Sequence, residues 1–314
     1  MKILIGYDGS KAADEALEDL KNAGLPKAAE VRILYAVPPL LPLDSLAPNS
    51  DGISWYASAY KEAVVNRAAT EAHALVQAKN AAKLLKKNFP AWKITPHIAL
   101  DIPAHALLLA AEEWRPDLIA MGSRGWNGFS KLILGSVADK VINHARCPVR
   151  LGKARKRAKA RPPRLLIAFD GSKYAEAAVT QAAGREWPKG TEARLLAVSE
   201  FQLRMGDITL ALSKTLGGKT GTQSAWPWME NKLAKAAARL EAAGIKTETA
   251  LIIGEPRHSL LAQAKKWDAD TILLGSRGIS GMQRFLLGSV SAGVAAHAPC
   301  SVEIVHIPAK GKRP

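Results

Sequence analysis

The stretch Gly122-Ser123-Arg124-Gly125 is followed after nine residues by Gly135-Ser136-Val137. The chain repeats this pattern, with the same nine-residue spacing, as Gly275-Ser276-Arg277-Gly278 and Gly288-Ser289-Val290. Each copy follows a short apolar run and precedes a segment with helical spacing, so the glycines belong to a strand-to-helix loop. The repeat therefore predicts two copies of one α/β arrangement.

A loop of this kind is suited to binding phosphate. Glycines let a ligand approach the backbone, and the unpaired amides and dipole of the next helix favour an anion. Ser136 and Ser289 follow the last glycine, which suits them to capping that helix and to offering a hydroxyl to phosphate. The alternative is that the glycines only make turns. Two copies with one spacing favour a shared constraint on the backbone, which ligand geometry or packing would both supply.

Outward from the loops, apolar runs and helical segments alternate through both halves. In the first half we expect strands at 2–7, 30–37, 93–100, 118–121 and 148–151, and helices after residue 11 and at 56–87, 103–114 and 136–145. In the second half we expect strands at 165–169, 193–198, 247–253, 271–274 and 301–306, and helices from 174 and at 230–243 and 256–266. Strand, helix and strand in this order imply right-handed crossovers. The predicted fold is α/β, with two tandem, doubly wound, Rossmann-like parallel-sheet domains.

The positive charge is concentrated between and after these domains. Of the net charge of +16, ten charges lie at 153–164 and 310–313, which leaves the rest of the chain only mildly basic. We expect a first domain at 1–152, a solvated linker at 153–163, a second domain at 164–307 and a basic tail at 308–314. Binding of nucleic acid or anionic lipid through the linker is the alternative, and the lack of interleaved aromatic residues disfavours it.

Each domain also places an acid near its loop. Asp8 and Asp170 begin Asp-Gly-Ser turns directly after the first strand of each half. Ligands of parallel sheets bind beyond the carboxyl ends of the strands, so acid and loop can face one crevice. There the acid can bond a ribose hydroxyl or help to hold Mg²⁺. The alternative interpretation of the turn is a helix cap.

These motifs resemble the universal stress protein family, whose nucleotide-binding members carry Gly-x-x-Gly, nine residues and Gly-Ser/Thr after the fourth strand. The resemblance covers nearly the whole chain as two tandem domains. It implies two ATP sites, with ADP or AMP as other occupants. The first would comprise Asp8, Val37, Met121, Gly122, Arg124, Gly125, Gly135, Ser136 and Val137. The second would comprise Asp170, Val198, Leu274, Gly275, Arg277, Gly278, Gly288, Ser289 and Val290. The valines would meet the adenine, the acids the ribose, and the loops the phosphates.

The first half departs from the family pattern in one place. The glycine before the third helix is kept as Gly254, whereas the first half has Asp101. If the Asp101 carboxylate points into the first crevice, its charge would weaken phosphate binding. We therefore expect the second site to bind nucleotide at least as tightly as the first.

Other motifs point to no further chemistry. Cys147 and Cys300 occupy equivalent places, and two buried thiols in a reducing compartment fit better than a disulfide. The segment 217–221 resembles part of a P-loop but lacks its first glycine, so we interpret it as a flexible loop. With no apolar run long enough for a signal peptide or a membrane span, we expect a cytoplasmic protein.

Three functions fit these features. The first is an ATP-binding stress or regulatory module with a protein partner; the second is an enzyme that hydrolyses ATP slowly or uses it for transfer; the third is a nucleotide-free interaction module. No complete catalytic set stands out, which disfavours the second, and the intact loops disfavour the third. The family resemblance also implies pairing through the last strand. The two domains of one chain would form a pseudo-dimer in this way, and a further homodimer is open.

Overall fold

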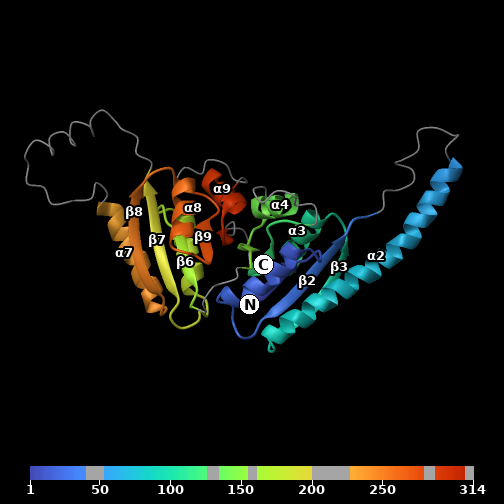
Figure 1. Cartoon of the computed structure of the whole chain (residues 1–314), viewed down its shortest axis with the longest axis horizontal. Helices are drawn as coiled ribbons and strands as arrows, with labels where there is room; N and C mark the ends of the chain where they lie inside the picture. The colour runs from blue at the N-terminus through green and yellow to red at the C-terminus, as the bar shows by residue number, and fades with distance from the viewer. Residues whose placement is uncertain (40–52, 126–133, 155–160, 200–226, 279–286, 308–314) are drawn as a thin grey trace, which may run out of the picture. The chain divides into compact units, whose positions relative to one another are not determined.

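The computed structural model describes residues 1–39, 53–125, 134–154, 161–199, 227–278 and 287–307, without the side chains of 53–65. The chain divides into two compact units, the first formed mainly by Met1–Lys156 and the second by Arg157–Val305 (Figure 1). Each unit is an α/β domain. The P-loop-like segment at 217–221 and the tail at 308–314 lie outside the described residues.

The first unit alternates strands and helices as the sequence predicts. Its elements are β1 (Lys2–Gly6), α1 (Lys11–Asp19), the 3-10 turn η1 (Leu20–Asn22), β2 (Glu30–Val37), α2 (Ile53–Asn88), β3 (Lys93–Leu100), α3 (Pro103–Trp114), β4 (Leu118–Gly122), α4 (Ser136–His144) and β5 (Val149–Gly152). The strands lie in the order β3-β2-β1-β4-β5, and every described pairing among them is parallel. The order reverses between β1 and β4, where parallel sheets of this type bind ligands.

The second unit repeats this arrangement. Its elements are β6 (Arg164–Ala168), α5 (Lys173–Ala183), β7 (Glu192–Ser199), α7 (Pro227–Ala242), β8 (Lys246–Ile253), α8 (Pro256–Lys266), β9 (Thr271–Gly275), α9 (Ser289–His297) and β10 (Ser301–Val305). The strands lie in the order β8-β7-β6-β9-β10, again with parallel pairings throughout the described part. The prediction of two doubly wound domains is confirmed.

Alternating side chains of the central strands explain the layers. Ile3, Ile5 and Tyr7 pack in one core with residues of α1 and α2. Gly6 points to the other face, where an added Cβ would lie 2.9 Å from Leu107 of α3. Helices therefore cover both faces of the sheet. In the second unit, the equivalent core joins β6 and β7 to α5 and α7.

The predicted boundaries are correct to within about three residues. α2 begins at Ile53 rather than at residue 56, and it ends at Asn88. Figure 1 shows this helix extending well past β3, along which its carboxyl-terminal part packs. Its counterpart α7 has 16 residues against 36 in α2, so the two domains differ most in this element. Within the described residues, no helix is both long and apolar enough to cross a membrane.

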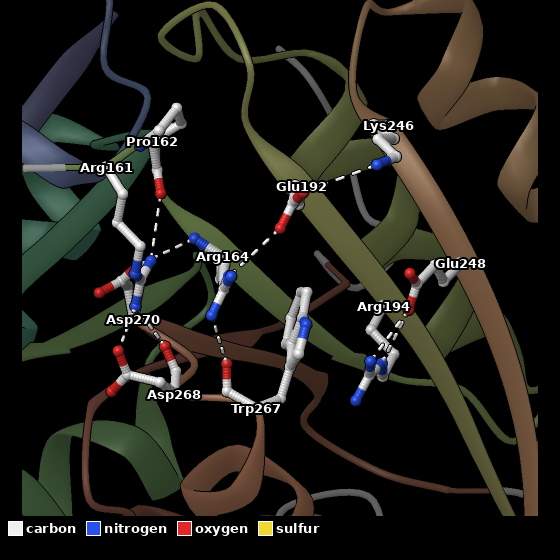
Figure 2. A network of polar contacts seen from close by, with 10 residues as sticks. All are labelled: Arg161, Pro162, Arg164, Glu192, Arg194, Lys246, Glu248, Trp267, Asp268 and Asp270. Atoms are coloured by element: carbon white, nitrogen blue, oxygen red, sulfur yellow. Dashed lines mark hydrogen bonds and ion pairs between the residues drawn. The ribbon is translucent and has the colours of Figure 1, made fainter.

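The end of the basic run is not solvated, contrary to the expectation for a linker. The guanidinium of Arg161 donates to Oδ2 of Asp268 and to Oδ2 of Asp270, both at 2.7 Å, and its side chain is only 20% exposed (Figure 2). Arg164, the first residue of β6, bonds to Glu192 and to the Trp267 carbonyl. Asp268 and Asp270 lie just before β9, 107 and 109 residues from Arg161, whereas Glu192 begins β7. Sequence alone therefore could not show that these charges are paired.

A second feature of this cluster occurs in both domains. Arg164 and Arg194 lie 5.7 and 4.6 Å from the ring centre of Trp267, as Lys2 and Arg32 lie 5.5 and 4.4 Å from that of Trp114. Cations over indole rings are attracted to the face of the π-system. The clusters lie where β1 and β6 begin. They therefore pack at the amino-terminal end of each sheet, away from the carboxyl ends of the strands where the glycine loops lie.

Candidate functional site

The Asp-Gly-Ser turns do two things at once. Oδ1 of Asp8 accepts a hydrogen bond from the Ser10 amide at 2.9 Å, and Oγ of Ser10 accepts one from the Ala13 amide at 3.2 Å. Gly9 takes a φ of 75°, which glycine adopts at least cost. The turn thus caps α1, as the alternative interpretation held, and still leaves the second carboxylate oxygen of Asp8 facing elsewhere. The Asp170 turn repeats both bonds, at 2.9 and 3.2 Å, in front of α5.

The second oxygen of each acid faces the glycine loop. A Cβ built on Gly125 would lie 2.8 Å from Oδ2 of Asp8, and one built on Gly278 would lie 2.7 Å from Oδ2 of Asp170. Real Cβ atoms essentially never come so close, so a side chain at either position would have to push the carboxylate aside, which glycine avoids. The acid and the loop lie next to each other in each domain, although Gly125 comes 117 positions after Asp8 in the chain.

The first glycine of each loop leaves room for close packing against a helix. A Cβ on Gly122 would lie 2.8 Å from the backbone of Ala12, and a Cβ on Gly275 would lie 2.5 Å from Cβ of Tyr174. The end of the fourth strand thus packs directly on the first turn of α1 or α5. Packing therefore accounts for glycine at these two positions, while the ligand explanation of the shared spacing stays a prediction for the other glycines.

The last glycine closes the loop. The Gly135 amide donates to the Ser123 carbonyl at 2.9 Å, and the Gly288 amide donates to the Ser276 carbonyl at the same distance. Each bond joins the serine after the first glycine of the loop to the residue just before α4 or α9. The first-turn amides of that helix therefore begin directly at the closed loop.

The serines do not cap these helices as we expected. The N-cap residues are Gly135 and Gly288, neither of which has a capping side chain, and Ser136 and Ser289 are already the first helical residues. The closing bond of the loop places the glycine, rather than the serine, at the boundary. Both serine side chains are exposed, so the second expected role, a hydroxyl offered to phosphate, is the one that their positions allow. Val137 and Val290, the next residues, are half-buried.

The apolar residues expected at the sites lie at carboxyl ends of strands. Val37 ends β2 and Met121 precedes the end of β4, and the two residues are buried, with 4% and 6% of their surface exposed. Leu274 is likewise buried in β9, while Val198 in β7 is half-buried.

The two arginines differ in their surroundings. Nη1 of Arg277 donates to the Tyr174 hydroxyl at 3.0 Å, and the guanidinium lies 5.6 Å from the centre of that ring. The position equivalent to Tyr174 in the first domain is Ala12, which offers Arg124 no such group. The sequence comparison of the halves contained this difference, but only the structure shows that Tyr174 reaches the glycine loop.

Asp101 is held by its own helix. Its Oδ1 accepts from the Ile102 amide at 2.6 Å, and its Oδ2 pairs with Nδ1 of His105. The hydrogen bond from His105, together with the Ile102 amide, lowers the pKa of the Asp101 carboxyl. Both carboxylate oxygens are thus engaged at the start of α3, and the effect of Asp101 on phosphate binding stays a prediction. The two domains also differ here in backbone, because Gly254 takes a φ of 155° that L side chains rarely adopt.

The fold and the loops together define a class of protein: tandem, doubly wound α/β domains, each with an acid-faced glycine loop after its fourth strand. The chain belongs to the universal stress protein family, whose model matches residues 1–151 and again 163–306.

Individual relatives agree with this assignment. The chain is 31% identical over 158 residues to universal stress protein MJ0531 of Methanocaldococcus jannaschii, covering 50% of this chain and 84% of that protein. It is 25% identical over 306 residues to a universal stress protein of Mycolicibacterium smegmatis, covering 96% of both. The crystal structure of a universal stress protein from Archaeoglobus fulgidus covers 97% of this chain and 98% of its own at 23% identity, with a TM-score of 0.59. That likeness shows that the tandem fold is shared.

Proposed function

We propose that the chain binds adenine nucleotides, ATP or its products ADP and AMP, at its two glycine loops and acts as a nucleotide-dependent stress or regulatory module. One observation carries the proposal. In both domains a glycine leaves only 2.7–2.8 Å between its would-be Cβ and the acid, next to a loop closed onto a helix start. Turns made for packing alone would not need the acid at the same place twice.

The residues present fit a nucleotide. Asp8 and Asp170 keep one carboxylate oxygen for the turn and direct the other at the loop, where it can accept from ribose hydroxyls or help to hold Mg²⁺. The amides that follow Gly135 and Gly288, with the hydroxyls of Ser136 and Ser289, suit phosphate oxygens. Val37 and Val198 would border the adenine. Such an arrangement binds phosphate without activating a water molecule.

Two variants test the proposal in the full chain. Gly125→Val and Gly278→Val each place a side chain against the acid of one site, and neither glycine has a positive φ that valine would strain. Titration calorimetry with ATP should show two sites in the wild-type chain and one in each variant. Protein purified from cells and then denatured should release an adenine nucleotide.

Other outcomes would favour the competing functions. Wild-type protein that binds no adenine nucleotide would contradict the proposal and favour an interaction module without a ligand. Steady ADP production that is lost in Asp8→Ala and Asp170→Ala would instead indicate an ATPase.

The partners and the place of the protein in the cell are further proposals. Tandem family domains favour a pseudo-dimer within one chain through the last strand of each domain, and cross-linking of single-chain protein at high dilution would test it. Co-purification with a nucleotide-dependent partner, and fractionation of cells for a cytoplasmic location, test the remaining expectations.

A further inference from the structure

Tyr174 connects the first helix of the second domain with the glycine loop. It is the second residue of α5, and its hydroxyl accepts a hydrogen bond at 3.0 Å from Nη1 of Arg277. The guanidinium carbon lies 5.6 Å from the centre of the same ring, and the ammonium of Lys173 lies 5.2 Å from it. The tyrosine therefore holds Arg277 by its hydroxyl and by its π-face together.

The backbone on both sides of this contact is fixed. A Cβ on Gly275 would fall 2.5 Å from Cβ and 2.6 Å from the carbonyl carbon of Tyr174. The end of strand β9 therefore packs directly against the backbone and Cβ of Tyr174. Gly278, on the other side of Arg277, abuts Asp170. Arg277 thus lies between the glycine that packs on α5 and the glycine that faces the acid.

A guanidinium held in this way is suited to phosphate. Arginine presents five N–H donors in a planar fork that matches phosphate oxygens, and one donor of Arg277 bonds to the Tyr174 hydroxyl. Ordering a long side chain before the ligand arrives removes part of the entropic cost of binding. The first domain has Ala12 where the second has Tyr174, so Arg124 cannot be ordered by the same means.

We propose that Tyr174 is a positioning residue of the second nucleotide site, which orders Arg277 for contact with the phosphates and makes this site the tighter of the two for phosphorylated nucleotides. The inference rests on the proposed function and goes beyond it, because it assigns a difference between the sites. It predicts an effect on ATP that adenosine, which has no phosphate, does not show.

The experiment uses the full chain with its first site blocked by Gly125→Val. Replacing Tyr174 by Phe keeps the ring and removes the hydroxyl, so the fold should persist, which thermal unfolding checks. We expect the Kd for ATP to rise about fivefold, as for one lost hydrogen bond to a charged group in a partly exposed place. The Kd for adenosine should stay unchanged.

A double-mutant cycle separates positioning from structure. In an Arg277→Ala background, Tyr174→Phe should no longer change ATP affinity, because the tyrosine acts through the arginine. The reciprocal variant is Ala12→Tyr with the second site blocked by Gly278→Val, and it should tighten ATP binding at the first site by a similar factor.

Distinct results would overturn the inference. Unchanged ATP affinity in Tyr174→Phe, an equal loss for ATP and adenosine, or a loss that persists without Arg277 would each contradict it while leaving the proposed function standing. Wild-type protein that binds ATP at neither site would overturn both.

Discussion

At the scale of single residues, the repeated glycines satisfy three separate requirements. Gly122 and Gly275 let a strand end rest on helix backbone, Gly125 and Gly278 admit an acid, and Gly135 and Gly288 close the loop. A single sequence pattern thus combines the packing of a strand end, the close approach of an acid and the closure of the loop. Substitutions should separate these requirements, because each missing side chain meets a different neighbour.

The packing requirement predicts a stability difference within one loop. Gly275→Ala places a methyl group 2.5 Å from Tyr174, and we expect overpacking to lower the free energy of unfolding by about 2 kcal/mol. Gly288→Ala, whose new Cβ would meet nothing closer than 3.5 Å, should change it by less than about 0.5 kcal/mol. Urea unfolding measures both variants. Equal destabilisation by the two alanines would show that the close packing of Gly275 on Tyr174 is not the reason why this position needs glycine.

Burial predicts that the thiols are unreactive. Cys300 is buried and Cys147 is half-buried, and desolvation, with the nearby charge of Asp117, raises the pKa of the Cys147 thiol to about 12. At pH 8 the reactive thiolate is therefore almost absent in the folded chain. Iodoacetamide should label both residues slowly in native protein and quickly in urea, followed by mass spectrometry. Fast labelling of Cys147 in native protein would contradict the raised pKa of its thiol.

At the scale of elements, apolar periodicity predicted most helices and strands well. Such periodicity is local, so it survives without knowledge of the tertiary structure. The predictions that were wrong concern residues whose structure depends on contacts with residues distant in the sequence. Arg161 belongs by composition to a basic run, but Asp268 and Asp270 bring it onto the second domain. The N-cap of α4 is likewise Gly135, whose amide closes the loop, and not Ser136 as the sequence predicted.

The anchoring of Arg161 predicts a loss of stability on its removal. Arg161→Ala leaves Asp270, which is 5% exposed, without one charged partner, although the Arg164 amide still donates to it. We expect a loss of about 1–2 kcal/mol in the free energy of unfolding of the second domain. Lys189→Ala, which removes an exposed cation from the same domain, is the matched control and should be neutral. If the Arg161 variant is as stable as this control, the ion pairs of Arg161 do not stabilise the second domain, and the residue behaves as part of a solvated linker.

At the scale of the whole molecule, the two domains share a fold and a loop but not the surroundings of the loop. Three positions of the second domain differ from their equivalents in the first: Tyr174 corresponds to Ala12, Gly254 to Asp101 and Ser291 to Ala138. Ser291 is buried, and its hydroxyl donates to the Gly275 carbonyl at 2.8 Å. Sequence reasoning expected an unequal pair of sites because of Asp101. The structure gives a different basis for the same expectation, since Asp101 is bonded to Ile102 and His105.

Unequal surroundings predict two binding events of unequal affinity. In single-site chains, Gly125→Val reports the second site and Gly278→Val the first, and we expect the second to bind ATP about fivefold more tightly. The wild-type isotherm should then need two classes of site. Tighter binding by the first site would contradict this order, and its cause would have to be sought in the longer helix α2.

The sequence by itself determined the two α/β domains, their strand order along the chain, the glycine loops and the residues expected around them. These features depend on local periodicity and on glycine at fixed spacing, which neighbouring residues alone specify. The tertiary structure decided which glycine packs and which faces the acid, that Arg161 is paired, and that Tyr174 reaches Arg277. Each of these joins residues about a hundred positions apart, and only the parallel sheet, by bringing the ends of its strands together, makes them neighbours.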